Sequence, residues 1–318
     1  MEPKIIFSSV CVGFLSACVS MKSLTVQGTA SIAPLAEVSM RQESSLEAFR
    51  AGAPGGLQLM EASLSADPGN KALLSALAKG YHGYAVVVAE TDMLAESFSE
   101  NTLRYSRDLA INYHTRAVAR AKAFLREVGM PWPDMTKSGV DVSSLNSFRN
   151  DQTVIDVAFV AGSSLKSLVA LQKGRPQALT YMPVAALLTE FACSGKLKPS
   201  YPAWACQVMN AVELAERPVV AGGDLGQAGQ IFSTLSKTDS LELFPQVLAA
   251  QHVLSKKKNE AEWKRIKDSA QAFKAKQFEN QNNVASSPAA ASGDSSALLN
   301  AAALRRIEII TAHEKDFF

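Results

Sequence analysis

Helical periodicity runs along almost the whole chain from Gln42 onward and restricts the fold class more than any other feature. Apolar residues recur at steps of three and four, and strand-like alternation is rare. Turn residues, as in Asp67-Pro68-Gly69-Asn70, fall at intervals of about 15 to 20 residues. Hydrophobic residues make up 47% of the 318 positions, which is enough to build a sizeable core. The sequence therefore predicts an all-α protein of many consecutive helices.

Small residues placed one helical turn before large ones indicate how these helices pack. Ala78 lies between Leu77 and Tyr81, and Ala228 precedes Phe232. A small residue lets two antiparallel helices approach closely, while the large residues fill the groove to the next pair. We expect stacked antiparallel helix pairs that form a degenerate bundle like that of tetratricopeptide repeats.

The N-terminal segment has the pattern of a bacterial lipoprotein signal. Ile5 to Leu15 is apolar but too short to span a bilayer, and it leads into Leu15-Ser16-Ala17-Cys18. An apolar residue, two small residues and a Cys form a lipobox, in which the thiol accepts a diacylglyceryl group before cleavage. The sequence predicts a signal peptide over residues 1–17 and lipidation of Cys18. The alternatives are an ordinary secretory signal with a chance Cys, or a buried N-terminal helix.

This reading divides the chain into segments with different roles. Residues 18–40 would be a lipid-proximal tether, and residues 41–312 the helical domain. A low-complexity stretch at 280–293 predicts a mobile loop within that domain, and 313–318 a C-terminal tail. Acylation would place the protein on the periplasmic face of a bacterial membrane. Val19 follows the Cys, which favours the outer membrane.

Cys193 and Cys206 would be the remaining thiols of the mature chain in an oxidising compartment. They flank a turn-rich segment, Ser194 to Pro202. If that segment joins two antiparallel helices, the two sulfurs can meet in a disulfide. The alternative is two small buried apolar residues.

No residue pattern of a catalytic or metal site appears. None of the His residues has metal-ligand spacing to another His or to a Cys. The glycines of Gly222–Ala228 fit neither a dinucleotide-binding nor a P-loop pattern, and they predict a tight turn with Asp224 as helix N-cap. The formal net charge of +2 gives no reason to expect nucleic-acid binding. We predict no catalysis, no metal, no cofactor and no nucleic-acid partner.

Several longer strings together resemble one family, the tetratricopeptide lipoproteins associated with TRAP transporters (the T component, TatT). The resemblance covers about Arg41 to Ala312, behind the lipobox. Its most specific parts are Gly80-Tyr81-His82-Gly83-Tyr84-Ala85 and the Arg217-Pro218 to Asp224 segment. The strings that carry it are Leu57–Ala62, Leu77–Ala85, Arg217-Pro218, Gly222–Ala228 with Phe232, and Leu299–Arg306.

The resemblance implies a helical, periplasmic, lipid-anchored protein that works beside the solute-binding protein of a tripartite ATP-independent periplasmic transporter. It also implies a homo-oligomer, for which we expect a trimer. A groove between the helices would hold a partner or a small apolar ligand, and Tyr81, His82 and Tyr84 are the candidate lining residues. Core packing between repeats is the alternative role for these three.

Two other functions stay open at this point. One is a generic periplasmic scaffold lipoprotein for envelope assembly, which would use the same helical hairpins. The other is an enzyme acting on the cell wall or on a lipid, although the sequence announces no nucleophile and base for it.

Overall fold

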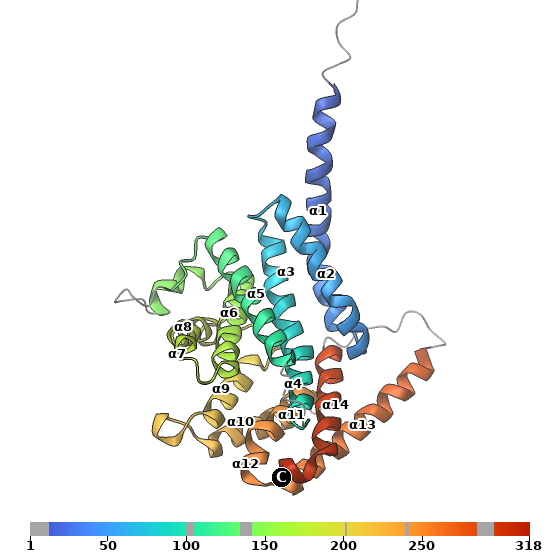
Figure 1. The fold of residues 1–318 in the computed structure, drawn as a ribbon, viewed down its shortest axis with the longest axis vertical. Coiled ribbons are helices and arrows are strands. Elements are labelled where there is room, and N and C mark those ends of the chain that lie inside the picture. The colour runs from blue at the N-terminus through green and yellow to red at the C-terminus, as the bar shows by residue number, and fades with distance from the viewer. Residues whose placement is uncertain (1–12, 100–104, 134–141, 201, 239–241, 285–295) are drawn as a thin grey trace, which may run out of the picture.

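The computed structural model describes residues 13–99, 105–133, 142–200, 202–238, 242–284 and 296–318 (Figure 1). Within these ranges the chain forms helices and no strand, so the predicted all-α class is confirmed. The elements in chain order are α1 (Gly13–Arg41), α2 (Leu46–Ala66), α3 (Lys71–Tyr84), η1 (Ala85–Ala89), α4 (Glu90–Glu96), α5 (Tyr105–Glu127), η2 (Val142–Phe148), α6 (Gln152–Leu171), α7 (Pro176–Leu179), α8 (Met182–Ser194), α9 (Ala205–Glu216), η3 (Val219–Ala221), α10 (Leu225–Thr238), α11 (Leu243–Ala249), η4 (Ala250–Leu254), α12 (Ser255–Lys257), α13 (Glu260–Val284), α14 (Ala297–Ala312) and α15 (Glu314–Phe317).

Helices that follow one another in the chain also pack on one another. α2 lies against α3, α3 against α5, α5 against α6, α6 against α8, and α9 against α10. α14 then returns to pack on α11 and α4, as Figure 1 shows. This sequential contact pattern is what a bundle of consecutive helices requires, since each helix buries its apolar stripe against a chain neighbour.

Polar caps and prolines set where several helices begin. Ser45, Asn70 and Asp151 each accept a hydrogen bond from a backbone N–H in the first turn of the following helix. Pro183 lies in the first turn of α8, where a missing N–H costs nothing. A single helix over Pro176–Cys193 is the simpler expectation from periodicity, and this proline is one reason that α7 and α8 are separate.

α6 is the central core helix. At Gly162 an added Cβ would lie 2.5 Å from Thr189 Cγ2 and 3.0 Å from the Ala185 carbonyl oxygen, so only glycine permits the close approach of α8. Residues Lys71–Glu96 and Gln152–Leu171 are long and apolar enough to cross a membrane by length and composition. Both stretches are mostly buried within the bundle, as core helices are.

α1 is a long helix that extends away from the bundle at one end of the molecule (Figure 1). Its C-terminal half packs on α2 and α3, where Val26 and Ala33 are buried. The segment expected to serve as a tether therefore also contributes to the folded body. Of the expected signal peptide, residues 1–12 lie outside the described part, and Cys18 falls within α1.

The C-terminal segments depart in part from the expected loop and tail. α13 continues to Val284, into the stretch 280–293 expected as a loop, and residues 285–293 lie outside the described part. The tail 313–318 forms α15 and packs back on the body. Phe318 stacks on Trp263 with 5.4 Å between ring centroids, and His313 stacks on Phe98 at 4.4 Å.

Candidate functional site

A cavity of about 1100 Å³, partly open to solvent, lies between the helices of the bundle. Its wall is built by α1, α2, α3, η1, α4, α6, α7, α8, α9, α11, η4 and α14, and most of the lining side chains are apolar. Phe159 and Val160 of α6, Phe244 and Leu248 of α11, and Leu298 of α14 are representative. The volume lies slightly above the range of about 300–1,000 Å³ usual for pockets that hold small molecules.

Small residues in α3 help create this space. A Cβ at Gly80 would lie 2.7 Å from Leu57 Cδ2, so this glycine lets α3 approach α2. A Cβ at Gly83 would meet no atom within 4 Å, and Gly83 is part of the cavity wall. The two glycines of this string therefore have different roles: Gly80 allows close packing of α3 on α2, and Gly83 leaves the adjacent part of the cavity unfilled.

The structure separates the three candidate lining residues. His82 lies in the cavity wall, whereas Tyr81 and Tyr84 are not among the described lining residues. Tyr81 is 2% exposed, and its hydroxyl donates to Glu61 Oε1 at 2.9 Å. Burial and this hydrogen bond raise the pKa of Tyr81 to about 12. The Tyr84 ring stacks on the Tyr113 ring with 4.5 Å between centroids. Tyr81 and Tyr84 are therefore both part of the hydrophobic core.

His82 is held by α6. Its Nδ1 lies 3.0 Å from the hydroxyl of Ser164, which is fully buried. The His114 ring lies 5.6 Å away between centroids. Burial, and then the proximity of His114, lower the pKa of His82 to about 3. The imidazole therefore stays neutral across the physiological pH range, and the part of it that is exposed faces the cavity.

Glu90 forms the acidic centre of the same wall. Its Oε1 accepts from His114 Nε2 at 3.0 Å and from the Ser167 hydroxyl at 3.3 Å, and its Oε2 lies 3.8 Å from Arg306 Nη2. Burial alone would raise the pKa of Glu90, but the His114 hydrogen bond and the Arg306 charge outweigh it. The pKa of Glu90 is lowered, and the carboxylate stays ionised.

Arg306 of α14, which lines the cavity, joins two π-helical turns. Its Nη2 donates to the Val86 carbonyl in η1 at 2.6 Å, and its Nη1 to Gln251 Oε1 in η4 at 3.3 Å. Its Nε donates to Thr91 Oγ1 at 2.9 Å, and the guanidinium lies 5.0 Å from the Phe244 ring centroid. π-Helical turns often occur at functional sites, and here they place polar groups toward one buried cation.

Two further ion-pair clusters lie in the wall. At the α1 side, Lys79 Nζ lies 3.3 Å from Glu37 and 3.4 Å from Asp156. At the α9 side, Lys166 Nζ donates to Glu213 Oε2 at 2.9 Å. Such pairs satisfy charges that burial would otherwise penalise.

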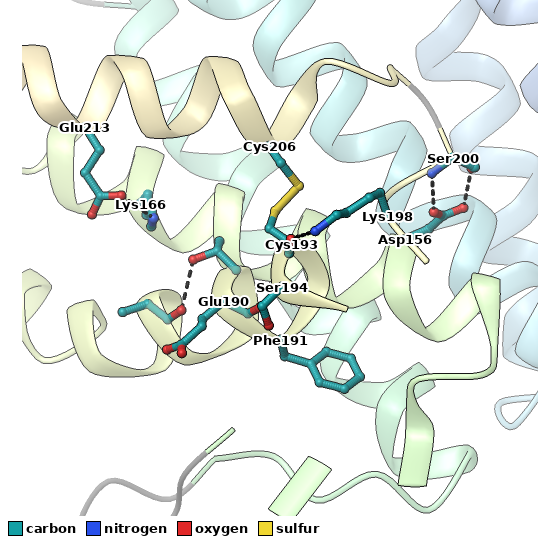
Figure 2. The surroundings of a disulfide bond; sticks show 12 residues. Asp156, Lys166, Glu190, Phe191, Cys193, Ser194, Lys198, Ser200, Cys206 and Glu213 are labelled. Carbon is teal, nitrogen blue, oxygen red and sulfur yellow. Dashed lines mark hydrogen bonds and ion pairs between the residues drawn. A yellow bond between two sulfur atoms is a disulfide. The ribbon is translucent and has the colours of Figure 1, made fainter. Parts of the chain in front are cut away.

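The loop between α8 and α9 is closed by a disulfide between its two flanking helices and is also bound to α6 (Figure 2). A disulfide joins Cys193 of α8 to Cys206 of α9, with 5.7 Å between their Cα atoms. Within the loop, Asp156 of α6 accepts from the Ser200 N–H at 2.8 Å and from the Ser200 hydroxyl at 2.6 Å. Pro199 and Ser200 line the cavity, so these contacts hold part of its wall.

The sequence interpretation missed most of the polar wall. Arg306 lies at helical spacing from Ala302 and Ala303, on the face of α14 that is otherwise buried. Asp156 and Lys166 interrupt the apolar α6 in the same way. A charged residue at a position that periodicity assigns to the core is the available signal. Its partners could not be read from the chain, because they come from distant helices.

Among the described residues, no group of three or more His, Cys, Asp or Glu side chains could hold a metal ion. The fold and the cavity define the class: an all-α protein with a large, mainly apolar cavity. The chain belongs to the TRAP transporter T-component family, TAtT, whose family model matches residues 42–318. The resemblance stated from the sequence is confirmed. No curated protein gives a significant match.

Membership of this family makes the chain a component associated with a TRAP transporter of the bacterial envelope. The family consists of transport components and is not known as an enzyme family.

Proposed function

We propose that this protein docks the periplasmic solute-binding protein of its transporter and holds a small, mainly apolar ligand in the cavity. The cavity, which is large, mainly apolar and lined by paired charges, is the observation that carries the ligand-holding part. Family membership supports the docking part. A generic scaffold for envelope assembly would have no use for such a space.

The same proposal includes an anchor and an assembly. Acylated Cys18 would hold the body on the periplasmic face of a membrane, the outer membrane being favoured by Val19. The protein would act as a homo-oligomer, for which a trimer is the expected state. Residues 26–41 of α1 would then link the anchor directly to the cavity, since Ala33, Ala36 and Met40 are lining residues.

The tip between α9 and α10 is the surface we assign to docking. Val219 and Val220 are 83% and 99% exposed, which is unusual for two adjacent apolar residues. The turn is built tightly: Gly222 has φ +86°, and a Cβ at Gly223 would overlap the Arg217 carbonyl. Arg217 and Pro218 also line the cavity, so a partner bound at this tip would sit beside it.

Replacing both valines by Asp is expected to lower retention of the neighbouring solute-binding protein in a pull-down at least about tenfold, because the apolar contact is lost. The matched control is Leu59→Asp on α2. Leu59 is likewise an exposed apolar residue, with 60% exposure, but it is not among the residues that line the cavity. Unchanged retention by the double variant, or no retention by the wild type, contradicts the docking proposal.

Lipidation is tested with the two N-terminal cysteines. Cells grown with an alkyne analogue of palmitate are expected to label the wild-type protein and the Cys11→Ser variant, while Cys18→Ser removes the label. The physical reason is that the Cys18 thiol would accept the diacylglyceryl group, whose fatty-acyl chains carry the label, whereas Cys11 would lie within the segment that is removed. Label that persists in Cys18→Ser rejects the assignment.

A further inference from the structure

The charged side chains inside the cavity are balanced. At the α1 side, Lys79 and Arg41 face Glu37 and Asp156, with Arg41 Nη2 at 3.9 Å from Glu37. In the centre, Glu90 faces Arg306, and the pair has the neutral His82 beside it. Each of these two groups carries as many cations as anions.

The α9 side continues the pattern and then changes at the edge. Lys166 pairs with Glu213 inside the wall. At the edge, Glu216 accepts from His252 at 3.0 Å and Lys256 at 2.7 Å, and these hydrogen bonds lower the pKa of Glu216 to about 2 in spite of its partial burial. Lys173, which is 76% exposed, lies 3.9 Å from the same carboxylate. Excess cations therefore gather at the solvent-exposed edge, not inside.

The remaining lining Lys and Arg residues, Lys173, Arg175 and Arg217, are all exposed. A ligand that carried a net charge into the buried part of this space would therefore find no unmatched opposite charge there among the described lining residues. An ionised carboxylate moved from water to an apolar site without such a partner loses its hydration and gains little in return. To pair with Arg306 or Lys79 it would have to displace Glu90, Glu37 or Asp156, each of which would then be left buried and unpaired.

His82 supplies the polar contact that an uncharged ligand can use. Its Nδ1 faces Ser164, and its Nε2 makes no hydrogen bond to another described residue. If Ser164 donates to Nδ1, then Nε2 carries the proton and donates; in the other tautomer Nε2 accepts. A hydroxyl group can form a hydrogen bond with Nε2 in either tautomer, because a hydroxyl both donates and accepts. A carboxylate can only accept, so it can bind only the tautomer in which Nε2 carries the proton.

We propose that the cavity selects uncharged amphiphiles with a hydroxyl head group, bound to His82, over amphiphiles of the same chain length that carry a carboxylate. This inference rests on the ligand-holding part of the proposed function and names its ligand class. The apolar wall takes the hydrocarbon chain, and the neutral imidazole takes the head.

The test uses the full-length protein, purified in one nonionic detergent at pH 8 and incubated with equal amounts of oleyl alcohol, 1-monooleoylglycerol and oleate. Lipids retained after gel filtration are counted by mass spectrometry. Gly83→Phe provides the micelle background, because its side chain would occupy the open space beside Gly83. We expect the wild type to retain the two hydroxyl lipids at least about tenfold over oleate, above that background.

Two variants of His82 separate recognition from folding. His82→Leu is expected to lose most of the preference, while His82→Gln, an uncharged side chain that donates and accepts, keeps most of it. Circular dichroism spectra of both variants are compared with that of the wild type to check folding. If His82→Leu is unfolded, the inference is judged from the ratio of hydroxyl lipids to oleate retained by the wild type and by His82→Gln. Oleate retained as well as or better than the hydroxyl lipids by the wild type overturns the inference but leaves ligand holding intact. Retention of no lipid above the Gly83→Phe background overturns both.

Discussion

Replacing Arg306 by Ala is expected to lower the free energy of unfolding by about 3–5 kcal/mol, the usual cost of removing one partner of a buried ion pair. Arg306 is 3% exposed. Burial lowers the pKa of Arg306, and the negative charge of Glu90 offsets part of that effect. The Ala variant leaves Glu90 without its cation. It also leaves the Val86 carbonyl and the Gln251 side chain without their donor.

Chemical denaturation followed by circular dichroism measures this effect. Arg305→Ala is the matched control, since Arg305 is the adjacent residue, lies half-exposed and, among the described residues, forms an ion pair only with Glu308, at 3.4 Å. Its change should stay within about 0.5 kcal/mol. The double variant Glu90→Gln with Arg306→Met removes both charges, and it should be more stable than Arg306→Ala alone. Equal stabilities for Arg305→Ala and Arg306→Ala would show that the pair does not hold η1 and η4 together.

Removing the disulfide by Cys193→Ala with Cys206→Ala is expected to cost about 3 kcal/mol, as chain entropy predicts for a closed loop of this size. The two cysteines are 13 residues apart. For a chain of this length the loss corresponds to a fall in Tm of about 5 °C. Thermal unfolding in the absence and presence of a reductant measures it.

The reductant provides the internal control. It should lower the Tm of the wild type to that of the double variant and leave the variant unchanged. Asp156 still holds Ser200 when the sulfurs are absent, so the fold should survive with a looser loop. A reductant that shifts both proteins equally, or neither, is incompatible with a stabilising bond between these residues.

The fold could be predicted from the sequence because its evidence is local. Apolar spacing predicts a helix over Val154–Gln172, and α6 runs over Gln152–Leu171, within two residues at each end. Apolar periodicity is a poorer guide to where a helix is interrupted. Apolar spacing alone predicts a single helix over Leu94–Val128, whereas α4 ends at Glu96 and α5 begins at Tyr105. No Gly or Pro marks that interruption, which is the punctuation on which such predictions depend.

The candidate site could be predicted only in part. His82 was singled out from the Gly-Tyr-His-Gly-Tyr string together with Tyr81 and Tyr84, yet one of the three lies in the cavity wall. On a helix, adjacent side chains point about 100° apart, so a motif read as a unit spreads over several faces. Which face meets the cavity depends on the neighbouring helices.

The sequence by itself determined that this chain forms helices, that they stack in order and that it belongs with TRAP transporter T components, because apolar spacing, caps and family strings act over a few residues. The tertiary structure alone decided that α1 joins the cavity wall and that Arg306 meets Val86 and Glu90, more than 200 positions earlier in the chain. Pairing between distant buried charges depends on where whole helices come to lie, and no local pattern of residues carries that information.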